Sequence, residues 1–357
     1  MMTMLTIVGA RPQFIKAFAV SRALQPDHEE VLVHTGQHYD DELSGVFFDE
    51  LGMDEPDYNL GIGSGSHGEQ TGEMIVALDD VVLEENPDVI LVYGDTNSTL
   101  AGAVVGSKLD AMLAHVEAGL RSGNRHMPEE TNRIITDHVS DVLFTPSAGA
   151  TERLAAEGIT QDVHTVGDVM YDSLLWAREQ AAERSTILDD LGLGEGEFIL
   201  STVHRAANTD DPERLEAIVR GLAATSRSVV LAAHPRTVDR LQTHGLWELA
   251  TRELKVIDPV GYLDFVRLLD GAARVATDSG GVQKEAFYMD TQCVTMRDET
   301  EWPETVDAGW NALVGADDEA IHKELENASK PRIKPEPYGD GSAGAQIVEI
   351  LAKYGGW

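Results

Sequence analysis

Short apolar runs alternate with segments of helical periodicity along almost the whole chain of 357 residues. This alternation is typical of βα units, in which parallel strands lie buried between helices. The helical periodicity is visible at Ile15, Phe18 and Ala19, which share one helix face. The apolar runs of the first half predict strands over Leu5–Gly9, Val31–Thr35, Val89–Tyr93, Ala111–His115, Val142–Thr145 and Val163–Val166.

The pattern weakens between Leu191 and Phe198 and then begins again. The second half predicts strands over Phe198–Val203, Val229–Ala233, Lys255–Ile257, Arg274–Thr277 and Cys293–Met296. The sequence therefore predicts an α/β fold with two doubly wound, Rossmann-like domains. Open parallel sheets bind ligands beyond the carboxyl ends of their strands, so we expect two such domains to face one cleft.

The chain is strongly acidic, with 27 Lys and Arg against 62 Asp and Glu and a net charge of −35. Because 42% of its residues are hydrophobic, it is a folded protein and not a solvated acidic tail. We expect a halophilic protein, since molar salt screens such repulsion over a Debye length of roughly 3 Å. An ordinary acidic enzyme at low salt is the alternative. Either way, the charge argues against a nucleic-acid or anionic-membrane partner.

The one cysteine, Cys293, excludes an internal disulfide and lies in an apolar run, which favours core packing over a role as nucleophile. The N-terminal stretch lacks the cationic and apolar regions of a signal peptide, and no apolar run approaches 18 residues. We therefore expect a cytoplasmic protein.

Two cations follow the first predicted strand. Gly9 ends the strand, Pro12 suits a first helical turn, and Arg11 and Lys16 flank it. Free amides at a helix start attract anions, and a guanidinium matches phosphate oxygens. The stretch predicts an anionic, phosphorylated ligand, although a surface arginine beside a turn is the simpler alternative. A dinucleotide is disfavoured because the G-x-G-x-x-G pattern is incomplete.

Acidic residues follow two further strands. Asp95 comes after Gly94, where it is most often a helix cap or a ribose partner, with Thr96 or Asn97 as a possible N-cap. The next strand leads into a segment that brings further charged and polar residues to the same edge: Glu117, Arg121, Glu129, Glu130, Asn132 and Arg133. Several carboxylates in one cleft suit proton transfer at carbon, because their pKa values separate into acids and bases.

The second half repeats this arrangement with basic residues and glycines. His204 with Arg205, and His234, end two strands, while Ser279, Gly280 and Gly281 open a helix that contains Glu285. Glycines allow a phosphate to approach the amides of a helix start. His34 and His38 are four residues apart but not on a helix, so no metal site is predicted.

These strand-end motifs, in this order, closely resemble the non-hydrolysing UDP-N-acetylglucosamine 2-epimerases. The matching pieces cover nearly the whole chain: GARPQFIK, TGQHYD, VYGDTNSTLAG, HVEAGLRSGNRHMPEETNR, TVHRAANTDD and DSGGVQKEA followed by MRDETEWPETVDAG.

The resemblance implies a fold like that of GT-B glycosyltransferases, with a UDP-sugar in the interdomain cleft. The family interconverts UDP-GlcNAc and UDP-ManNAc by anti elimination of UDP to 2-acetamidoglucal and re-addition, with no metal or other cofactor. It also implies a homodimer that serves glycan or polysaccharide precursor supply, and a C-terminal helix that returns to the first domain. We expect domains over residues 1–168 with 342–357, and over 169–341.

By motif match, the resemblance assigns the acid, base and phosphate-stabilising roles to Asp95, Glu117, Glu129 and His204. Residues matching UDP contacts, and those near them, are Arg11, Ser279, Gly280, Gly281 and Glu285, with Lys16, Arg133 and His234. Glu129 is preferred over Glu130 because it directly follows Pro128. Which carboxylate is the C2 base stays open.

The chain departs from the family pattern at several positions. Ala207 stands where many bacterial members have Glu, and Trp302 stands where many have Arg. Asp40 and Glu69 replace a Gln and an Arg of an allosteric UDP-GlcNAc site. The alternatives are a 2-epimerase of a related UDP-diacetamido-uronic acid, a GT-B glycosyltransferase and an inactive nucleotide-sugar sensor.

Overall fold

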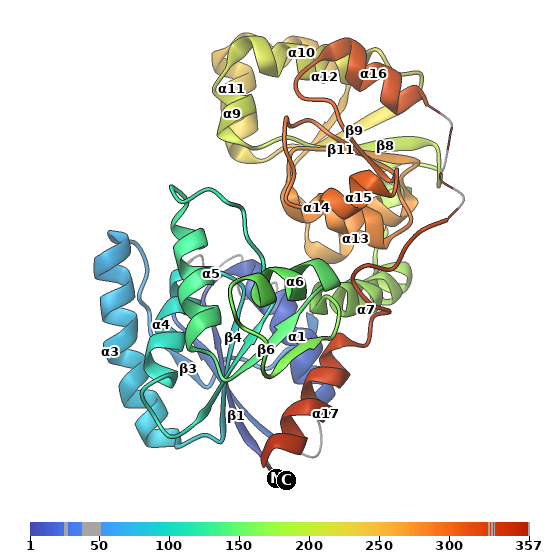
Figure 1. Ribbon diagram of the computed structural model, residues 1–357. Helices are drawn as coiled ribbons and strands as arrows, with labels where there is room; N and C mark the ends of the chain where they lie inside the picture. Colours follow the sequence, from blue (N-terminus) through green and yellow to red (C-terminus); the bar gives the residue numbers. More distant parts are fainter. Residues whose placement is uncertain (25–27, 38–50, 328, 330, 332, 356–357) are drawn as a thin grey trace. The chain divides into compact units, whose positions relative to one another are not determined.

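A computed structural model describes residues 1–24, 28–37, 51–327, 329, 331 and 333–355, with the side chain of Arg11 outside this set (Figure 1). The chain divides into two compact units. Unit 1 contains Met1–Leu175 and Glu336–Trp357, and unit 2 contains Trp176–Pro335. Within the described residues, no helix has the length and apolar character needed to span a membrane.

The described part of unit 1 is built on a seven-stranded parallel sheet with the order β3-β2-β1-β4-β5-β6-β7. Its strands are β1 (Thr3–Val8), β2 (Glu29–His34), β3 (Tyr58–Asn59), β4 (Val89–Tyr93), β5 (Met112–Val116), β6 (Val142–Thr145) and β7 (Val163–Thr165). All five residues of β4 are buried. A nearly continuous apolar strand of this kind is covered by helices on both faces.

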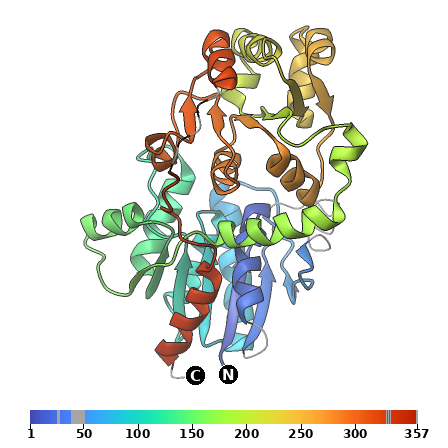
Figure 2. The same cartoon turned by 90° about the vertical axis from the view of Figure 1, so that its right-hand side faces the viewer.

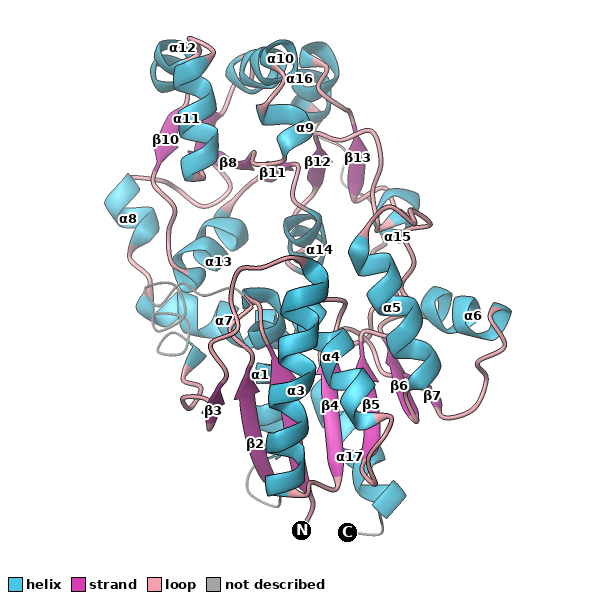
Figure 3. Ribbon diagram, turned by 90° about the vertical axis from the view of Figure 1, so that its left-hand side faces the viewer, coloured by secondary structure: helices cyan, strands magenta, loops and turns pink. Residues whose placement is uncertain are grey.

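Helices cover both faces of this sheet (Figure 3). They are α1 (Arg11–Leu24), α3 (His67–Glu85), α4 (Asn97–Gly106), α5 (Pro128–Val139), α6 (Ala148–Ala156), the first part of α7 (Val169–Arg184) and α17 (Ala343–Gly355). One layer contains α3, α4 and α5 packed side by side, and α1 packs with α17. The strand order reverses direction between β1 and β4, which is where sheets of this kind bind ligands.

The described part of unit 2 repeats the plan with a six-stranded parallel sheet in the order β10-β9-β8-β11-β12-β13. Its strands are β8 (Phe198–Thr202), β9 (Ser228–Ala232), β10 (Lys255–Ile257), β11 (Arg274–Thr277), β12 (Cys293–Thr295) and β13 (Asn311–Leu313). Its helices are α8 (Ile187–Leu191), α9 (Ala206–Thr209), α10 (Pro212–Ala223), α11 (Pro235–Thr243), α12 (Trp247–Glu253), α13 (Tyr262–Gly271), α14 (Gly280–Tyr288), α15 (Pro303–Asp307) and α16 (Asp318–Glu326). The order reverses between β8 and β11.

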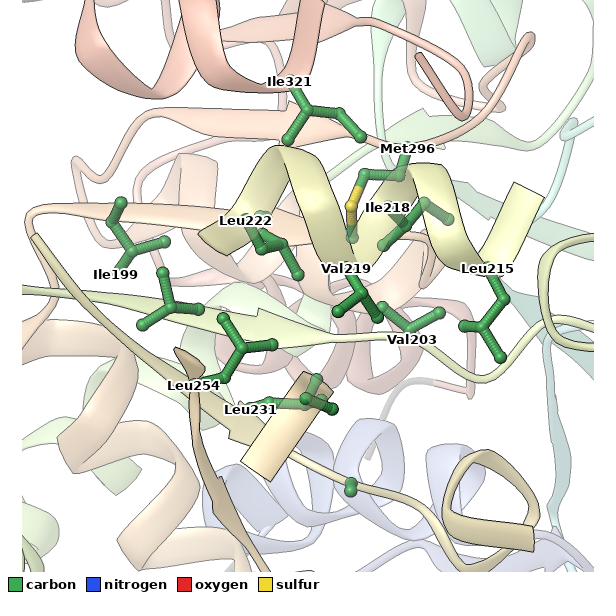
Figure 4. Close-up of a cluster of buried hydrophobic side chains, with 14 of the residues drawn as sticks. Ile199, Val203, Leu215, Ile218, Val219, Leu222, Leu231, Leu254, Met296 and Ile321 are labelled. Carbon is green, nitrogen blue, oxygen red and sulfur yellow. The ribbon is translucent and has the colours of Figure 1, made fainter. Parts of the chain in front are cut away.

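The core of unit 2 lies between this sheet and its helices. Ile218 and Leu222 of α10 contact a cluster that includes Ile199 of β8 and Ile321 of α16 (Figure 4). Cys293 of β12 is buried, as the sequence predicts, and burial raises the pKa of its thiol to about 12.

The predicted strands are present in the structure. Those at β4, β6, β10 and β11 match residue for residue, and the others shift by one or two residues at their ends. Two short edge strands, β3 and β13, were not predicted from the sequence. The unit boundaries differ from those expected after residues 168 and 341. The units divide inside α7, which is one helix (Figure 2), between residues 175 and 176, and again between residues 335 and 336.

The C-terminal helix α17 belongs to unit 1 and packs against α1. Gly344 makes this close approach possible, because a Cβ added there would lie 2.4 Å from the carbonyl oxygen of Ala19. Its amide donates to Asp172 Oδ2 at 2.8 Å. Burial raises the pKa of Asp172 to about 6, and the bonds from Gly344 and Ala343 offset only part of that effect.

We predict opposite effects for two glycine-to-alanine changes. Gly344→Ala should lower the free energy of unfolding by about 1–3 kcal/mol, because its methyl group meets backbone atoms. Gly72→Ala in α3 should raise it by about 0.5–1 kcal/mol, because a Cβ there meets no atom within 4 Å and alanine favours the helix. Urea unfolding at constant salt measures both. Equal effects of the two changes would contradict the close packing of α17 on α1.

Candidate active site

The turn between β1 and α1 is closed by a buried glutamine. Gln13 Oε1 accepts from the amides of Gly9 at 2.8 Å and Ala10 at 3.1 Å, and its Nε2 donates to the carbonyl of Tyr93 at 2.7 Å. The expectation that free amides at this turn attract an anion is therefore wrong for these two amides. Gly9 is required by packing, since a Cβ there would lie 2.0 Å from Ser98 Oγ.

Lys16 and Glu117 form an ion pair at the switch point of unit 1. Lys16 Nζ and Glu117 Oε2 lie 3.1 and 3.2 Å from the position that a Cβ on Gly94 would take, so both side chains lie directly over Gly94. Glu117 has a φ of 70°, a left-handed conformation that costs about 1–2 kcal/mol for a residue with a Cβ. The fold therefore holds the backbone of Glu117 in a strained conformation.

Asp95 is held from α5 by a fork of two donors. Arg133 Nε and Nη2 donate to Asp95 Oδ2 at 3.0 and 2.7 Å, while Arg133 Nη1 donates to Glu130 Oε2 at 2.7 Å. Asn132 Nδ2 donates to the carbonyl of Asp95 at 2.9 Å. The guanidinium of Arg133 thus contacts two carboxylates and fixes Asp95. Thr96 is the N-cap of α4, one of the two expected positions.

Glu129 and Glu130 differ sharply in environment. Glu130 is 3% exposed and accepts from the amides of Ser122 at 2.8 Å and Gly123 at 2.9 Å. Burial opposes its ionisation, yet these bonds and the one from Arg133 together lower its pKa below the ordinary glutamate value. Glu129 is half-buried and forms no ion pair with another described residue. Glu130 is a structural carboxylate, and Glu129 is the one available for a ligand.

In unit 2, a buried aspartate anchors His204. Asp278 is fully buried and accepts from the amides of His204 and Arg205 at 3.0 Å each. His204 Nδ1 lies 3.4 Å from Asp278 Oδ1, and the rings of His204 and His234 are 6.4 Å apart between centroids. Burial lowers the pKa of His204, and the charge of Asp278 offsets this only in part. Burial therefore disfavours the charged form of the His204 imidazole.

The helix start at Ser279, Gly280 and Gly281 is open on the side of Gly281, whereas a Cβ on Gly280 would lie 3.4 Å from Glu301 Oε2. Ser279 is the N-cap of α14, and its hydroxyl makes no capping bond. A Cβ at Gly281 would meet only Ser279 Oγ at 4.0 Å. The first-turn amides of a helix have no acceptor within it, so this position can receive an anion. Glu285, one turn further, is 7% exposed.

Trp302 braces this helix start. Its Nε1 donates to the carbonyl of Gly280 at 2.9 Å, and Lys284 Nζ lies 4.0 Å from the centre of its ring. The adjacent Glu301 accepts two bonds from Arg297 at 2.8 Å each and lies 3.6 Å from Arg205. Lys284 and Arg205 thus keep positive charge beside the residue that replaces an arginine of the family pattern.

The remaining predicted residues are placed as follows. Arg11 begins α1, but its side chain lies outside the described residues, as do His38 and Asp40. Glu69 lies in the first turn of α3. The described residues contain no group of three His, Cys, Asp or Glu side chains arranged to hold a metal.

A family model described as UDP-N-acetylglucosamine 2-epimerase matches residues 22–352. The chain belongs to this family. As a member of an epimerase family, it falls in the predicted isomerase class.

Relatives of the UDP-N-acetylglucosamine 2-epimerase family match at full length. A Methanococcus maripaludis protein described as a UDP-N-acetylglucosamine 2-epimerase homolog is 51% identical over 98% of this chain and 99% of its own. The UDP-2,3-diacetamido-2,3-dideoxy-D-glucuronate 2-epimerase of Pseudomonas aeruginosa is 50% identical over 99% of this chain and 100% of its own. The crystal structure of Methanocaldococcus jannaschii UDP-GlcNAc 2-epimerase in complex with UDP-GlcNAc and UDP is similar, with a TM-score of 0.86 and 42% sequence identity. The match covers 99% of this chain and 100% of that chain. The predicted family and fold class are confirmed.

The site residues of this 2-epimerase family member fall into two groups. Unit 1 brings together Lys16, Asp95, Glu117 and Arg133, and unit 2 brings His204 and His234 together. The sequence prediction missed the buried residues that hold these groups, above all Gln13 and Asp278. A polar residue on the buried face of a helix was the available signal for Gln13, since Phe14 and Ile15 beside it are buried.

We predict that the two adjacent glutamates separate in their effects on stability. Glu130→Gln should lower the free energy of unfolding by about 3 kcal/mol, because the amides of Ser122 and Gly123 and the charge of Arg133 lose their carboxylate. Glu129→Gln, the matched control, should change it by less than about 0.5 kcal/mol. Denaturant unfolding at constant salt measures both. A comparable loss in Glu129→Gln would contradict the assignment of Glu130 as the structural member.

Proposed function

We propose that the chain is a non-hydrolysing UDP-N-acetylglucosamine 2-epimerase that interconverts UDP-GlcNAc and UDP-ManNAc. Family membership supports the reaction class. The observation that carries the proposal is the ion pair of Lys16 and Glu117 over Gly94, the residue directly before Asp95. Carboxylates next to a cation, at the edge where a parallel sheet binds ligands, suit removal of a weakly acidic proton from a sugar carbon.

The proposed reaction divides its tasks between two kinds of residue. A carboxylate of unit 1, from Asp95, Glu117 or Glu129, takes the C2 proton as the bond from C1 to the UDP oxygen breaks. The electron pair of the C2–H bond becomes the double bond of 2-acetamidoglucal, and UDP leaves with the pair of the C1–O bond. UDP then adds back at C1 while C2 is protonated on the other face. Cations and helix amides accept the charge of the departing diphosphate.

We assign the diphosphate to the open helix start of unit 2. The available amides after Ser279, the open space at Gly281 and the nearby side chains of His204 and Arg205 support this assignment. His234 and Glu285 are proposed to contact the nucleotide, together with Arg11 and Lys16 from unit 1. Arg133 acts through Asp95, since both its donor edges contact carboxylates.

Incubation with UDP-GlcNAc in D2O at molar salt tests the proposal. We expect UDP-ManNAc to form and deuterium to appear at C2 in the NMR spectrum, because the C2 proton exchanges with solvent at the carboxylate. Glu117→Gln should bind UDP and lose most of the exchange, since an amide cannot accept that proton. Free GlcNAc or transfer to an acceptor would indicate a glycosyltransferase instead, and binding without turnover would indicate a sensor.

A second candidate is a 2-epimerase of a UDP-2,3-diacetamido-2,3-dideoxy uronic acid. The 50% identity to the Pseudomonas aeruginosa enzyme exceeds the 42% identity to the Methanocaldococcus jannaschii enzyme, and Trp302 replaces an arginine of the UDP-GlcNAc pattern. The same D2O experiment with both sugars discriminates them. A kcat/KM at least about tenfold higher for the uronic acid, equivalent to about 1.4 kcal/mol, would favour the second candidate.

We also propose a cytoplasmic, halophilic homodimer that supplies glycan or polysaccharide precursors. Val76 and Leu83 support an association surface, because they are 68% and 62% exposed and lie seven residues apart on α3. The net charge of −35 supports halophily.

Stability should therefore rise with salt. We expect a higher melting temperature at about 1 M KCl than at about 0.1 M, because the Debye length falls from roughly 10 to 3 Å and repulsion between surface carboxylates weakens. A variant with Asp79→Asn and Asp80→Asn, both exposed on α3, should gain less from the added salt. Calorimetry at the two concentrations measures the difference. An unchanged melting temperature in the wild type would contradict halophily.

A further inference from the structure

A histidine is buried in the middle of the sheet of unit 1. His115 lies on β5, between β4 and β6, and is fully buried. Its Nε2 lies 2.8 Å from the carbonyl oxygen of Gly94, and its Nδ1 lies 2.7 Å from Asp137 Oδ1 of α5. Both ring nitrogens therefore face oxygen atoms that can accept a hydrogen bond.

The partners determine the charge of this ring. A carbonyl oxygen only accepts, so Nε2 must carry a hydrogen. Asp137 also accepts from Arg121 Nη1 at 2.6 Å and from the amide of Gly119 at 3.2 Å, which is the environment of an ionised carboxylate. An ionised Asp137 requires a hydrogen on Nδ1 as well. His115 is then an imidazolium paired with Asp137, and the alternative is a neutral pair with the proton on Asp137.

This ion pair is bonded to both turns that carry the proposed catalytic carboxylates. Gly94, bonded through its carbonyl, directly precedes Asp95, and Gly119, bonded through its amide, lies two residues after Glu117. Positive φ values occur at three residues of these turns: 65° at Gly94, 70° at Glu117 and 80° at Gly119. Such conformations persist where surrounding bonds determine them, and His115 and Asp137 supply those bonds from inside the sheet.

We propose that the buried His115–Asp137 ion pair positions Asp95 and Glu117 for proton transfer at the sugar C2. Neither residue touches the proposed substrate site through a side chain of its own, so both are positioning residues. The proposal rests on the proposed function for its catalytic consequence. The charge of His115 and the order of the two turns are independent of that function.

The chain offers a matched control within the same network. Arg121 contacts Asp137 on one side and Glu157 on the other, where Nε and Nη2 donate at 2.8 and 2.7 Å. The side chain of Glu157 is 31% exposed, whereas that of Asp137 is fully buried. Glu157→Gln and Asp137→Asn therefore each replace a carboxylate bonded to Arg121 by an amide, the first at the exposed side of Arg121 and the second at the buried side.

Neutron diffraction from wild-type crystals in D2O tests the charge directly. We expect deuterium on both Nδ1 and Nε2 of His115 and none on the carboxylate of Asp137. A neutral ring, with deuterium on one nitrogen or on Asp137, would overturn the proposal without any variant having to fold.

Kinetics and amide exchange test the positioning role. Well below the melting temperature, Asp137→Asn should lower kcat for C2 deuterium exchange about 10- to 100-fold with KM within about twofold, the size seen for residues that orient a functional group. Its Gly119 amide should exchange about tenfold faster or more. Glu157→Gln should change neither. A folded Asp137→Asn variant with wild-type kcat, or with an unchanged Gly119 amide, would overturn the proposal.

The two proposals can fail separately. Wild-type protein without any C2 exchange would overturn the proposed function, and the neutron and amide-exchange results would still decide whether the ion pair orders the two turns.

Discussion

The reversal of strand order in each sheet is the constraint on which both halves of the candidate site depend. At β1 and β4, and again at β8 and β11, neighbouring parallel strands lead to connections that leave in opposite directions. Side chains at the next few positions therefore converge at the carboxyl ends of these strands. Lys16, Asp95 and Glu117 gather at the first reversal, while His204 and Ser279 follow the strands of the second.

Charge is distributed very unevenly in this protein. Across the whole chain, acidic residues outnumber basic ones by more than two to one, yet the cations near the strand ends are buried or half-buried against carboxylates. Arg133 contacts Asp95 and Glu130, and Arg121 contacts Asp137 and Glu157. Each pair is costly to place away from water, and the fold repays that cost with several hydrogen bonds to each carboxylate. The acidic surface and the paired interior are thus separate features with separate causes.

Sequence pattern predicted what depends on local composition. Strand β4 was found residue for residue because five consecutive apolar residues between Asp88 and Gly94 are typical of a buried strand. Strands β3 and β13 were missed because each has at most three residues and includes an asparagine, so neither forms a recognisable apolar run. The boundary between the two units was not predicted at its observed position because it lies inside α7, where helical periodicity continues without a break.

The candidate site was predictable to the same extent. Strand-end residues could be placed at one edge because topology alone brings them there. The buried residues that hold these strand-end residues in place could not be predicted. Gln13 bonds to Tyr93, 80 residues away, and the interaction of His115 with Asp137 appears only once β5 and α5 are packed. The structural role of Glu130 also could not be predicted, because it depends on the turn at Ser122 and Gly123, which no periodicity reveals.

The burial of Cys293 has a practical consequence. The Cys293 thiol lies inside a strand, and burial raises its pKa to about 12, so it forms too little thiolate to react with maleimides or disulfide reagents. The native chain is therefore chemically silent toward such reagents. If one cysteine were introduced on an exposed helix of each unit, only these two thiols would react. Paired spin or fluorescent labels can therefore be attached without first replacing Cys293.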